Sequence, residues 1–286
     1  MFSMTELGGG VGGAVRALRQ RRGITLRELA ADLGVSPGTM SAIENGKVAV
    51  TVERLQQLAA VLHVGVAELV APPFEPVLAR PESVDAGADW AVFDRLELDP
   101  VLAAAVEVFA ETGYHGATMR VVAAAADLSV AGIYRYHRSK QRLLVALADA
   151  QLSDLGWRVE AAAAQAPDPA QAFAAMVRAL VLCQISRREL AFIVETELRS
   201  LQEPDRSRIA ALRHGVQRRF VEVADEAVRA GLFTTAAPAA GAEAVVSLCR
   251  AVPFRFDGAA LPDGPALAIE YAALASAMMG GSVQLS

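Results

Sequence analysis

Basic side chains gather near the start of this 286-residue chain, where they could bind a polyanion. Between residues 14 and 47, six bases stand against three acids, although the whole chain has a formal net charge of −5. The bases are Arg16, Arg19, Arg21, Arg22, Arg27 and Lys47. A local positive excess is what a phosphate-facing surface requires. The sequence therefore predicts one phosphate-binding segment in an otherwise acidic protein.

Catalytic chemistry finds little support in the sequence. The motifs HExxH, GxSxG and the P-loop are all missing from it. The histidines are scattered, with no carboxylate or cysteine at catalytic spacing: His63, His115, His137 and His214. Cys183 and Cys249 lie far apart in apolar patterns, which favours buried free thiols over a disulfide or a zinc site. We predict that the protein is not an enzyme and uses no metal or cofactor.

The composition favours an all-α fold. Hydrophobic residues make up 53% of the chain but aromatic residues only 6%, a balance set by alanine, which suits closely packed helices. No uncharged apolar run is long enough to cross a membrane, and no signal peptide opens the chain. The sequence predicts a soluble, cytoplasmic protein without membrane contact.

The basic segment opens a unit of five expected helices. Helix caps and apolar spacing place them at residues 15–22, 26–33, 37–45, 52–62 and 66–70. Ser36 is the expected N-cap of the third helix, and Gly34 supplies the turn before it, where a positive φ is easiest. Two helices joined by so short a turn are typical of a helix-turn-helix.

This segment resembles the Xre family of phage-repressor-like DNA-binding domains. The patterns RxxRGxTxxxLAxxxGVS, IENG and LxxLAxxLxV occur in register between residues 19 and 64. The resemblance implies that the third helix enters the DNA groove and that neighbouring groups bind phosphate. The residues it implies are Arg27, Ser36, Pro37, Gly38, Ser41, Ala42, Asn45 and Gly46.

The implied recognition helix is poor in groups that read bases. Pro37, Gly38 and Ala42 have no side-chain donors, whereas direct readout depends on Arg, Gln, Asn or similar groups. One interpretation is a domain that docks on DNA with weak sequence discrimination. The alternative is a helical module that contacts another protein.

A second helix-turn-helix pattern begins near residue 99. The segment VFAETGYHGATMRVVAAAADLSVAGIYRYHRSKQRLL resembles the DNA-binding part of TetR-family repressors. The matching positions are Phe109, Gly113, Tyr114, Thr118, Ala123, Ala126, Ser129, Gly132, Tyr134, Ser139, Lys140 and Leu143. The resemblance implies phosphate contacts by Thr118, Tyr134 and Lys140. It implies groove contacts by Ser129, Val130, Ala131, Arg135 and Tyr136.

Long helices are expected after residue 140. The TetR resemblance implies that they enclose a ligand and that the last two pair with a second subunit, forming a homodimer. Small or apolar residues suited to that pairing are Ala242, Ala244, Val245, Leu248, Ala272, Ala273, Ala275 and Ala277, although ordinary core packing would explain them too. The candidate ligand-binding residues, equally compatible with core, are Phe173, Met176, Val177, Leu180, Phe192, Val194 and Phe220.

The C-terminal segments also resemble TetR regulators of lipid and steroid breakdown, several of which respond to acyl-CoA thioesters. Arginines that could meet CoA phosphates are Arg187, Arg188, Arg206, Arg208, Arg213, Arg218 and Arg219, although arginines on a helix often form only a solvated face. We predict a repressor that binds double-stranded operator DNA and is released by a hydrophobic or acyl-CoA-like effector. A multidrug-sensing repressor is the alternative.

Prolines at 72, 73, 76 and 81 mark a linker between the two patterns. The apolar residues from Trp90 onward are expected to dock on the second domain. The predicted parts are a flexible leader (1–13), the Xre-like domain (14–70), the linker (71–98), the TetR-like DNA-binding domain (99–145) and the ligand-binding and dimerisation domain (146–286).

Overall fold

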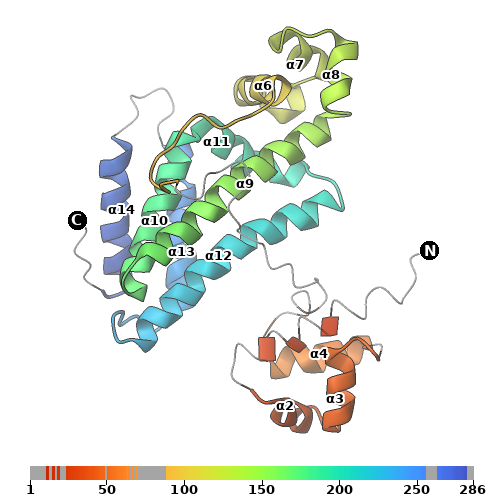
Figure 1. The fold of residues 1–286 in the computed structure, drawn as a ribbon, viewed down its shortest axis with the longest axis vertical. Coiled ribbons are helices and arrows are strands. Elements are labelled where there is room, and N and C mark those ends of the chain that lie inside the picture. The colour runs from red at the N-terminus through yellow and green to blue at the C-terminus, as the bar shows by residue number, and fades with distance from the viewer. Residues whose placement is uncertain are drawn as a thin grey trace. The chain divides into compact units, whose positions relative to one another are not determined.

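The computed structural model describes residues 11–12, 15–16, 18–19, 24–48, 50–62, 64, 66, 69, 88–255 and 263–281. Helices are the only regular secondary structure in these ranges, which confirms the expected all-α class (Figure 1). The chain divides into two compact units, Met1–Glu75 and Pro76–Ser286.

The first unit contains α2 (Leu26–Asp32), α3 (Pro37–Glu44) and α4 (Val52–Val61). Each begins where a threonine or serine side chain accepts a backbone N–H bond: Thr25, Ser36 and Thr51. Gly34 has a φ of 64° in the turn between α2 and α3. Leu29, Met40 and Leu58 are completely buried between the helices. Local capping and a shared apolar core thus fix the helix-turn-helix geometry.

The outer helices expected in this unit fall largely outside the described residues. From 15–22 the structure describes Val15, Arg16, Leu18 and Arg19, and from 66–70 only Val66 and Leu69. Val11, which lies in the predicted leader, is helical and buried in this unit's core. The packed core of this unit therefore includes a residue of the predicted leader. Residues 1–10 of the leader and residues 71–87 of the linker lie outside the described ranges.

The second unit begins with a three-helix head. Its helices are α6 (Pro100–Gly116), α7 (Met119–Ala125) and α8 (Val130–Tyr136). Helix α6 extends to Gly116 across a kink at Gly113, whose φ is 71°. Only glycine adopts this conformation without strain. The kink turns the end of α6 toward the start of α7.

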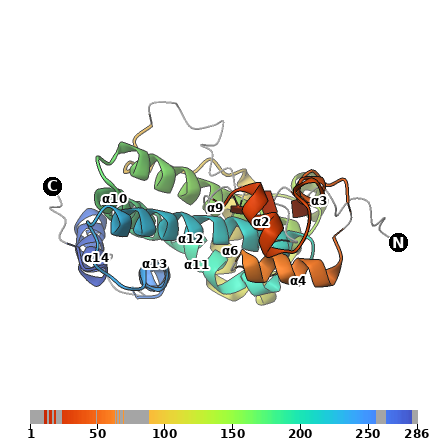
Figure 2. The ribbon, with the colours of Figure 1, turned by 90° about the horizontal axis from the view of Figure 1, so that it is seen from below.

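Long helices form the body of the second unit. They are α9 (Lys140–Gln165), α10 (Pro169–Ser186), α11 (Arg188–Glu197), α12 (Asp205–Arg229), α13 (Pro238–Arg250) and α14 (Gly264–Met278), with short 3₁₀ turns at Leu198–Ser200 and Val252–Phe254. Helix α10 packs between α9 and α14, and α13 packs on α12. Figure 2 shows α13 and α14 beside each other at one end of this unit.

Helix α10 is long and apolar enough to cross a membrane, but 67% of that stretch is buried inside the unit. Its Phe173 packs edge-to-face against Phe220 of α12 and against Phe233. Both cysteines are buried and free, and burial raises the pKa of each thiol to about 12. Helix α10 is therefore the central core helix of the second unit.

Residues 88–98, which we call the strap, run over this body without helical structure and with a turn at residues 90–91 before α6 begins. Trp90 is buried, and its indole Nε1 donates to Gln165 at 3.0 Å. Arg158 donates to the carbonyls of Trp90 (2.7 Å) and Val92 (2.8 Å). The expected docking of this end of the linker is present, and the strap belongs structurally to the second unit.

Candidate nucleic-acid interface

Helix α8 presents one side to its own unit and the rest to solvent. Ile133 is completely buried, whereas 49% of Tyr134 and 50% of Tyr136 is exposed. The side chain of Ser129 caps the helix by accepting from the N–H of Gly132 at 3.0 Å. All the residues predicted to face the groove are exposed, namely Ser129, Val130, Ala131, Arg135 and Tyr136, and so is Tyr134, a predicted phosphate contact. The local fold thus brings these predicted residues together on one surface.

Helix α7 adds a phosphate-binding candidate beside this surface. Thr118 is exposed and caps α7 by accepting from the N–H of Val121 at 3.3 Å. The turn from α7 to α8 holds Asp127 at a φ of 54°, a conformation that Asp tolerates better than most residues. A turn of this kind sets α8 across α7, as in a helix-turn-helix.

One carboxylate joins the start of α6 to the end of α8. Asp99 Oδ1 accepts from the N–H groups of Val101 and Leu102, both at 2.9 Å. Its other oxygen lies 2.9 Å from Nε2 of His137, the residue that ends α8. Sequence reasoning gave His137 no role, because its partner is 38 residues away. This contact positions the exposed helix relative to the strap and α6.

Lys140, for which a phosphate contact was predicted, makes hydrogen bonds within the protein. Its ammonium donates to the carbonyls of Tyr114 (2.6 Å) and Ala117 (2.8 Å) and lies 4.4 Å from the Tyr114 ring centroid. These carbonyls flank the end of α6, where backbone acceptors lack helical partners. Lys140 therefore positions the α6–α7 turn, while its positive charge has only neutral carbonyl partners among the described residues.

The first unit has an exposed surface around α3 that is comparable to the surface of α8 but has few side chains able to read bases. Exposed residues there include Arg27, Ser36, Pro37, Gly38 and Asn45, while Ser41 is half-buried. The amide of Asn45 donates to the Ser41 carbonyl at 2.8 Å. A contact of this kind leaves the amide less free to read a base edge.

A buried ion pair fixes the end of α3. Arg19 donates through Nε to Glu44 Oε1 at 2.6 Å and through a terminal nitrogen to Oε2 at 3.1 Å. The hydrogen bonds with Glu44 raise the pKa of Arg19. Because the guanidinium also donates to the Ile24 carbonyl at 2.9 Å, it joins α3 to the segment before α2. The structure thus holds α3 rigidly even though few of its side chains can read DNA.

The candidate ligand-binding residues do not line one open cavity. Phe173, Met176, Val177, Leu180 and Phe220 are completely buried in close packing. Phe192 and Val194 lie apart from this group on α11, where Phe192 packs on Phe254 with ring centroids 5.4 Å apart. A ligand among these residues would require the core to open.

The arginines expected near a CoA are largely paired with carboxylates. Ion pairs join Arg187 to Asp154, Arg208 to Asp149, Arg213 to Glu195 and Arg219 to Glu160. Arg206 donates to backbone carbonyls of residues 199 and 201. Most of this set therefore stabilises the body of the second unit.

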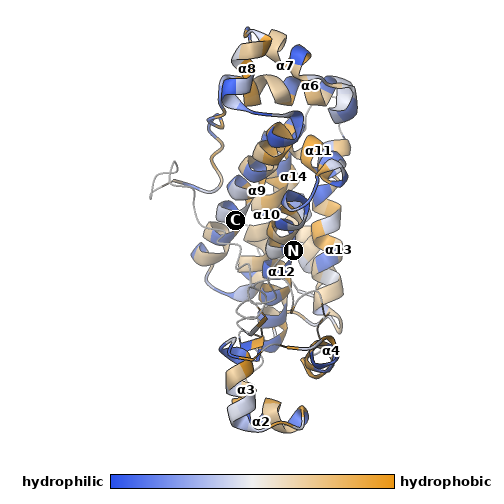
Figure 3. Cartoon of the chain, turned by 90° about the vertical axis from the view of Figure 1, so that its right-hand side faces the viewer, coloured by the Kyte–Doolittle hydropathy of each residue, from blue (hydrophilic) through white to orange (hydrophobic). Residues whose placement is uncertain are grey.

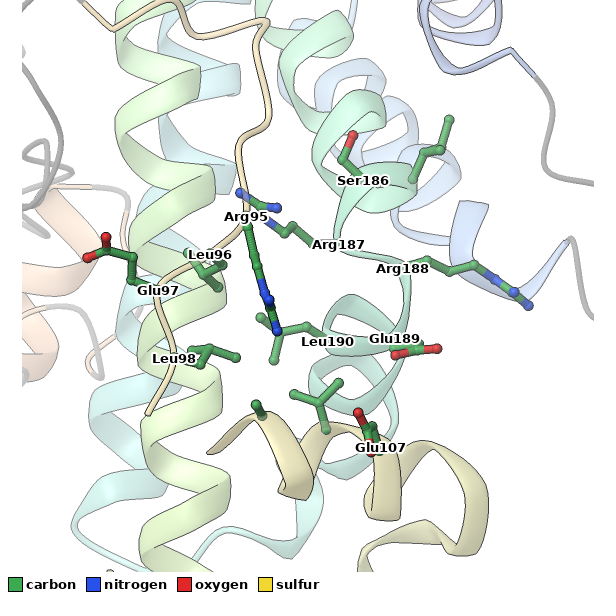
Figure 4. Close-up of a pocket in the computed structure, with 13 residues that line it drawn as sticks. Arg95, Leu96, Glu97, Leu98, Glu107, Ser186, Arg187, Arg188, Glu189 and Leu190 are labelled. Carbon is green, nitrogen blue, oxygen red and sulfur yellow. The ribbon is translucent and has the colours of Figure 1, made fainter. Parts of the chain in front are cut away.

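An open pocket of about 750 Å³ lies elsewhere in the second unit (Figure 4). Strap residues 95–98, the first turns of α6 and the α10–α11 junction line it. None of the apolar residues predicted to bind ligand is part of this lining, which does include Arg187 and Arg188. Sequence reasoning missed the pocket because its walls come from three separate segments.

Three family matches cover most of the chain. The family described as "Helix-turn-helix" matches residues 15–69. "Bacterial regulatory proteins, tetR family" matches residues 101–147, which include α7 and α8. "Tetracyclin repressor-like, C-terminal domain" matches residues 166–279. No curated protein matches the chain.

Solved structures resemble the second unit over nearly their whole length. A tetR-family regulatory protein from Rhodococcus RHA1 is 29% identical, with a TM-score of 0.61, covering 65% of this chain and 97% of its own. AibR, solved with isovaleryl coenzyme A and operator DNA, is 20% identical, with a TM-score of 0.56. The match covers 63% of this chain and 97% of the AibR chain. KstR2, a ketosteroid transcriptional regulator of Mycobacterium tuberculosis, is 18% identical, with a TM-score of 0.57. The match covers 66% of this chain and 100% of the KstR2 chain. Together with the family matches, these likenesses show that the chain belongs to the TetR family of bacterial regulatory proteins and carries an additional Xre-type helix-turn-helix domain ahead of the TetR part.

Proposed function

We propose that this DNA-binding regulator is a cytoplasmic, homodimeric repressor, not an enzyme, that reads its operator with α8. The observation that carries the proposal is the exposed surface of α8, where Tyr134, Arg135 and Tyr136 project from a helix anchored by Ile133 and His137. Arg135 is the side chain best suited to a base edge, and the tyrosine hydroxyls suit phosphates.

Replacing Arg135 with Ala should weaken binding to the operator by about 10- to 100-fold, because a bidentate base contact is worth roughly 1–3 kcal/mol. The loss should be much smaller on a scrambled duplex. Tyr134→Phe should weaken both duplexes to a similar extent, since a phosphate contact carries no sequence information. Fluorescence anisotropy on an operator selected from random duplexes would measure both effects at several salt concentrations.

Arg229→Ala is the matched control, because Arg229 is an exposed arginine at the far end of α12. It should bind both duplexes as the parent does. Unchanged operator affinity in Arg135→Ala and Tyr134→Phe together would contradict the role of α8.

The exposed faces of α13 and α14 support the homodimer. Leu248 is 53% exposed and Leu274 is 63% exposed, and Figure 3 shows mainly hydrophobic residues along α13. Of the residues predicted for pairing, Ala242, Val245, Ala272 and Ala275 are buried within the chain, whereas Ala244, Leu248, Ala273 and Ala277 are exposed. The exposed set recurs at four-residue spacing on each helix, which is the pattern a helix–helix contact needs. Two-fold symmetry also matches the way such regulators read paired half-sites.

A long-chain or polycyclic acyl-CoA should release the operator, whereas the corresponding free acid should act more weakly because it lacks the nucleotide. The likeness to AibR, which was solved with isovaleryl coenzyme A and operator DNA, supports this effector class. Binding must favour one of two conformations of the head, since a ligand with equal affinity for both shifts nothing. Titration of acyl-CoA into the preformed operator complex would measure the release.

CoA without an acyl group is the control and should leave the complex intact. Release by small hydrophobic drugs, with no response to any acyl-CoA, would contradict the acyl-CoA proposal and favour a multidrug sensor.

The Xre-type domain is proposed to add affinity through phosphate contacts on flanking DNA. Deleting residues 1–87 should leave a dimer that binds its operator more weakly, with a shorter footprint and a shallower salt dependence, because fewer phosphates are neutralised. The deletion ends before Ala88 because the strap is part of the second unit's core. Footprinting and binding at graded salt would measure the change.

Release of the operator by the effector is an internal control. It should persist in the variant that lacks residues 1–87. A footprint and affinity equal to those of the full chain would overturn the DNA-binding role and favour a protein-interaction module.

A further inference from the structure

The pocket beside the strap has the size and lining of a small-molecule site. Its volume of about 750 Å³ lies within the usual range for ligand pockets, roughly 300–1,000 Å³. Much of the lining is apolar: Leu96, Leu98, Ala103, Val106, Ile185 and Leu190. A hydrocarbon group would be well matched to these side chains.

One guanidinium, that of the exposed residue Arg95, reaches across this open pocket. In Figure 4 the Arg95 side chain extends across the pocket, while Glu97 and Arg188 point away from it. Among the described residues, no hydrogen bond or ion pair involves the Arg95 side chain. Arg187, on the same side, is already occupied by Asp154 (3.1 Å) and by the carbonyl of Asp94 (2.6 Å). Arg95 is therefore the cation that a bound acid would meet.

The first turn of α11 also favours a negatively charged ligand. Residues 188–190 form its first turn and line the pocket, and Arg187 makes no side-chain hydrogen bond as its N-cap. Unsatisfied N–H groups at a helix start favour a negative group. The carboxylates of Glu107 and Glu189 also belong to the lining, and they would repel a ligand with several negative charges. This combination favours one carboxylate over a phosphate or a CoA.

We propose that this pocket binds an amphipathic monocarboxylate, with its carboxylate on Arg95 near the start of α11 and its hydrocarbon over Leu98, Val106 and Leu190. None of the apolar residues predicted for effector binding lines this site, although Arg187 and Arg188, which were expected near a CoA, belong to its lining. A ligand here would contact the strap and α6 together, and α6 is the helix whose start is tied to the end of α8 through Asp99.

Isothermal titration of the full-length chain with decanoate and with 1-decanol would test this site. Decanoate should bind in a saturable manner and about tenfold or more tightly than the alcohol, as expected for a charge-assisted hydrogen bond. Arg95→Gln should remove that preference while leaving decanol binding unchanged. Ala103→Phe should abolish binding of both probes by filling the pocket, with its fold checked by circular dichroism.

Arg218→Gln is the control, because Arg218 is an exposed arginine on α12 outside the pocket lining. Equal affinity for acid and alcohol, an unaltered preference in Arg95→Gln, or decanoate binding that persists in a folded Ala103→Phe protein would each overturn the proposal. None of these measurements uses DNA, so they are independent of the proposed operator and effector.

Discussion

Asp154→Asn is expected to destabilise the second unit by about 3–5 kcal/mol, the usual cost of removing one partner from a buried ion pair. Asp154 accepts from Arg158 at 2.9 Å, from Arg187 at 3.1 Å and from the indole of Trp157 at 3.2 Å. Its side chain is only 6% exposed. The neutral amide would leave two arginines without their shared counter-charge in a poorly solvated place.

The strap should loosen in the same variant. Arg158 donates to the carbonyls of Trp90 and Val92, and Arg187 donates to that of Asp94, so Asp154 orients the groups that hold these three strap residues. Urea unfolding at fixed protein concentration would measure the stability, and hydrogen exchange would measure the protection around residues 90–94.

Asp149→Asn is the matched control, since it is the same change on the same helix. Asp149 pairs with Arg208, but both side chains are 38% exposed. An exposed pair contributes about 0–1 kcal/mol. Equal stability losses in Asp154→Asn and Asp149→Asn would disprove the central role of the buried network.

The double variant Leu248→Glu and Leu274→Glu should convert the dimer into monomers and lower operator affinity by about 10²–10⁴-fold. Two carboxylates would be buried against their symmetry mates without partners, which is strongly unfavourable. Each monomer would hold only one α8, so the avidity of two linked half-sites would be lost. Sedimentation velocity would measure the association state, and anisotropy would measure operator binding.

Val92→Glu is the control for adding a charge to an exposed apolar position. Val92 is as exposed as Leu248, at 53%, but its position is on the strap. This variant should remain dimeric and bind the operator normally. If the double variant stays dimeric at micromolar concentration, the face formed by α13 and α14 is not the dimer interface.

Local sequence determined the two helix-turn-helix units. Ser36, Thr118 and Ser129 each cap the helix that follows them through a bond to a residue three positions away, so sequence spacing alone locates these starts. The same helical period separates buried Ile133 from exposed Tyr134 and Arg135. Family resemblance then supplied the expected roles of the exposed side chains, which follow from short-range geometry.

Tertiary packing decided the tasks of residues whose partners lie far along the chain. Lys140 binds carbonyls 23 and 26 residues away, and Arg158 binds the strap carbonyls 68 and 66 residues away. Which alanines of α13 and α14 are buried within the chain depends on how these helices pack on α12 and α10. The spacing of apolar residues along the sequence identifies the apolar face of a helix. It does not identify the helix that packs on that face, because the packing partner depends on the tertiary fold. For the same reason the pocket beside Arg95 exists only once the strap, α6 and the α10–α11 junction are brought together.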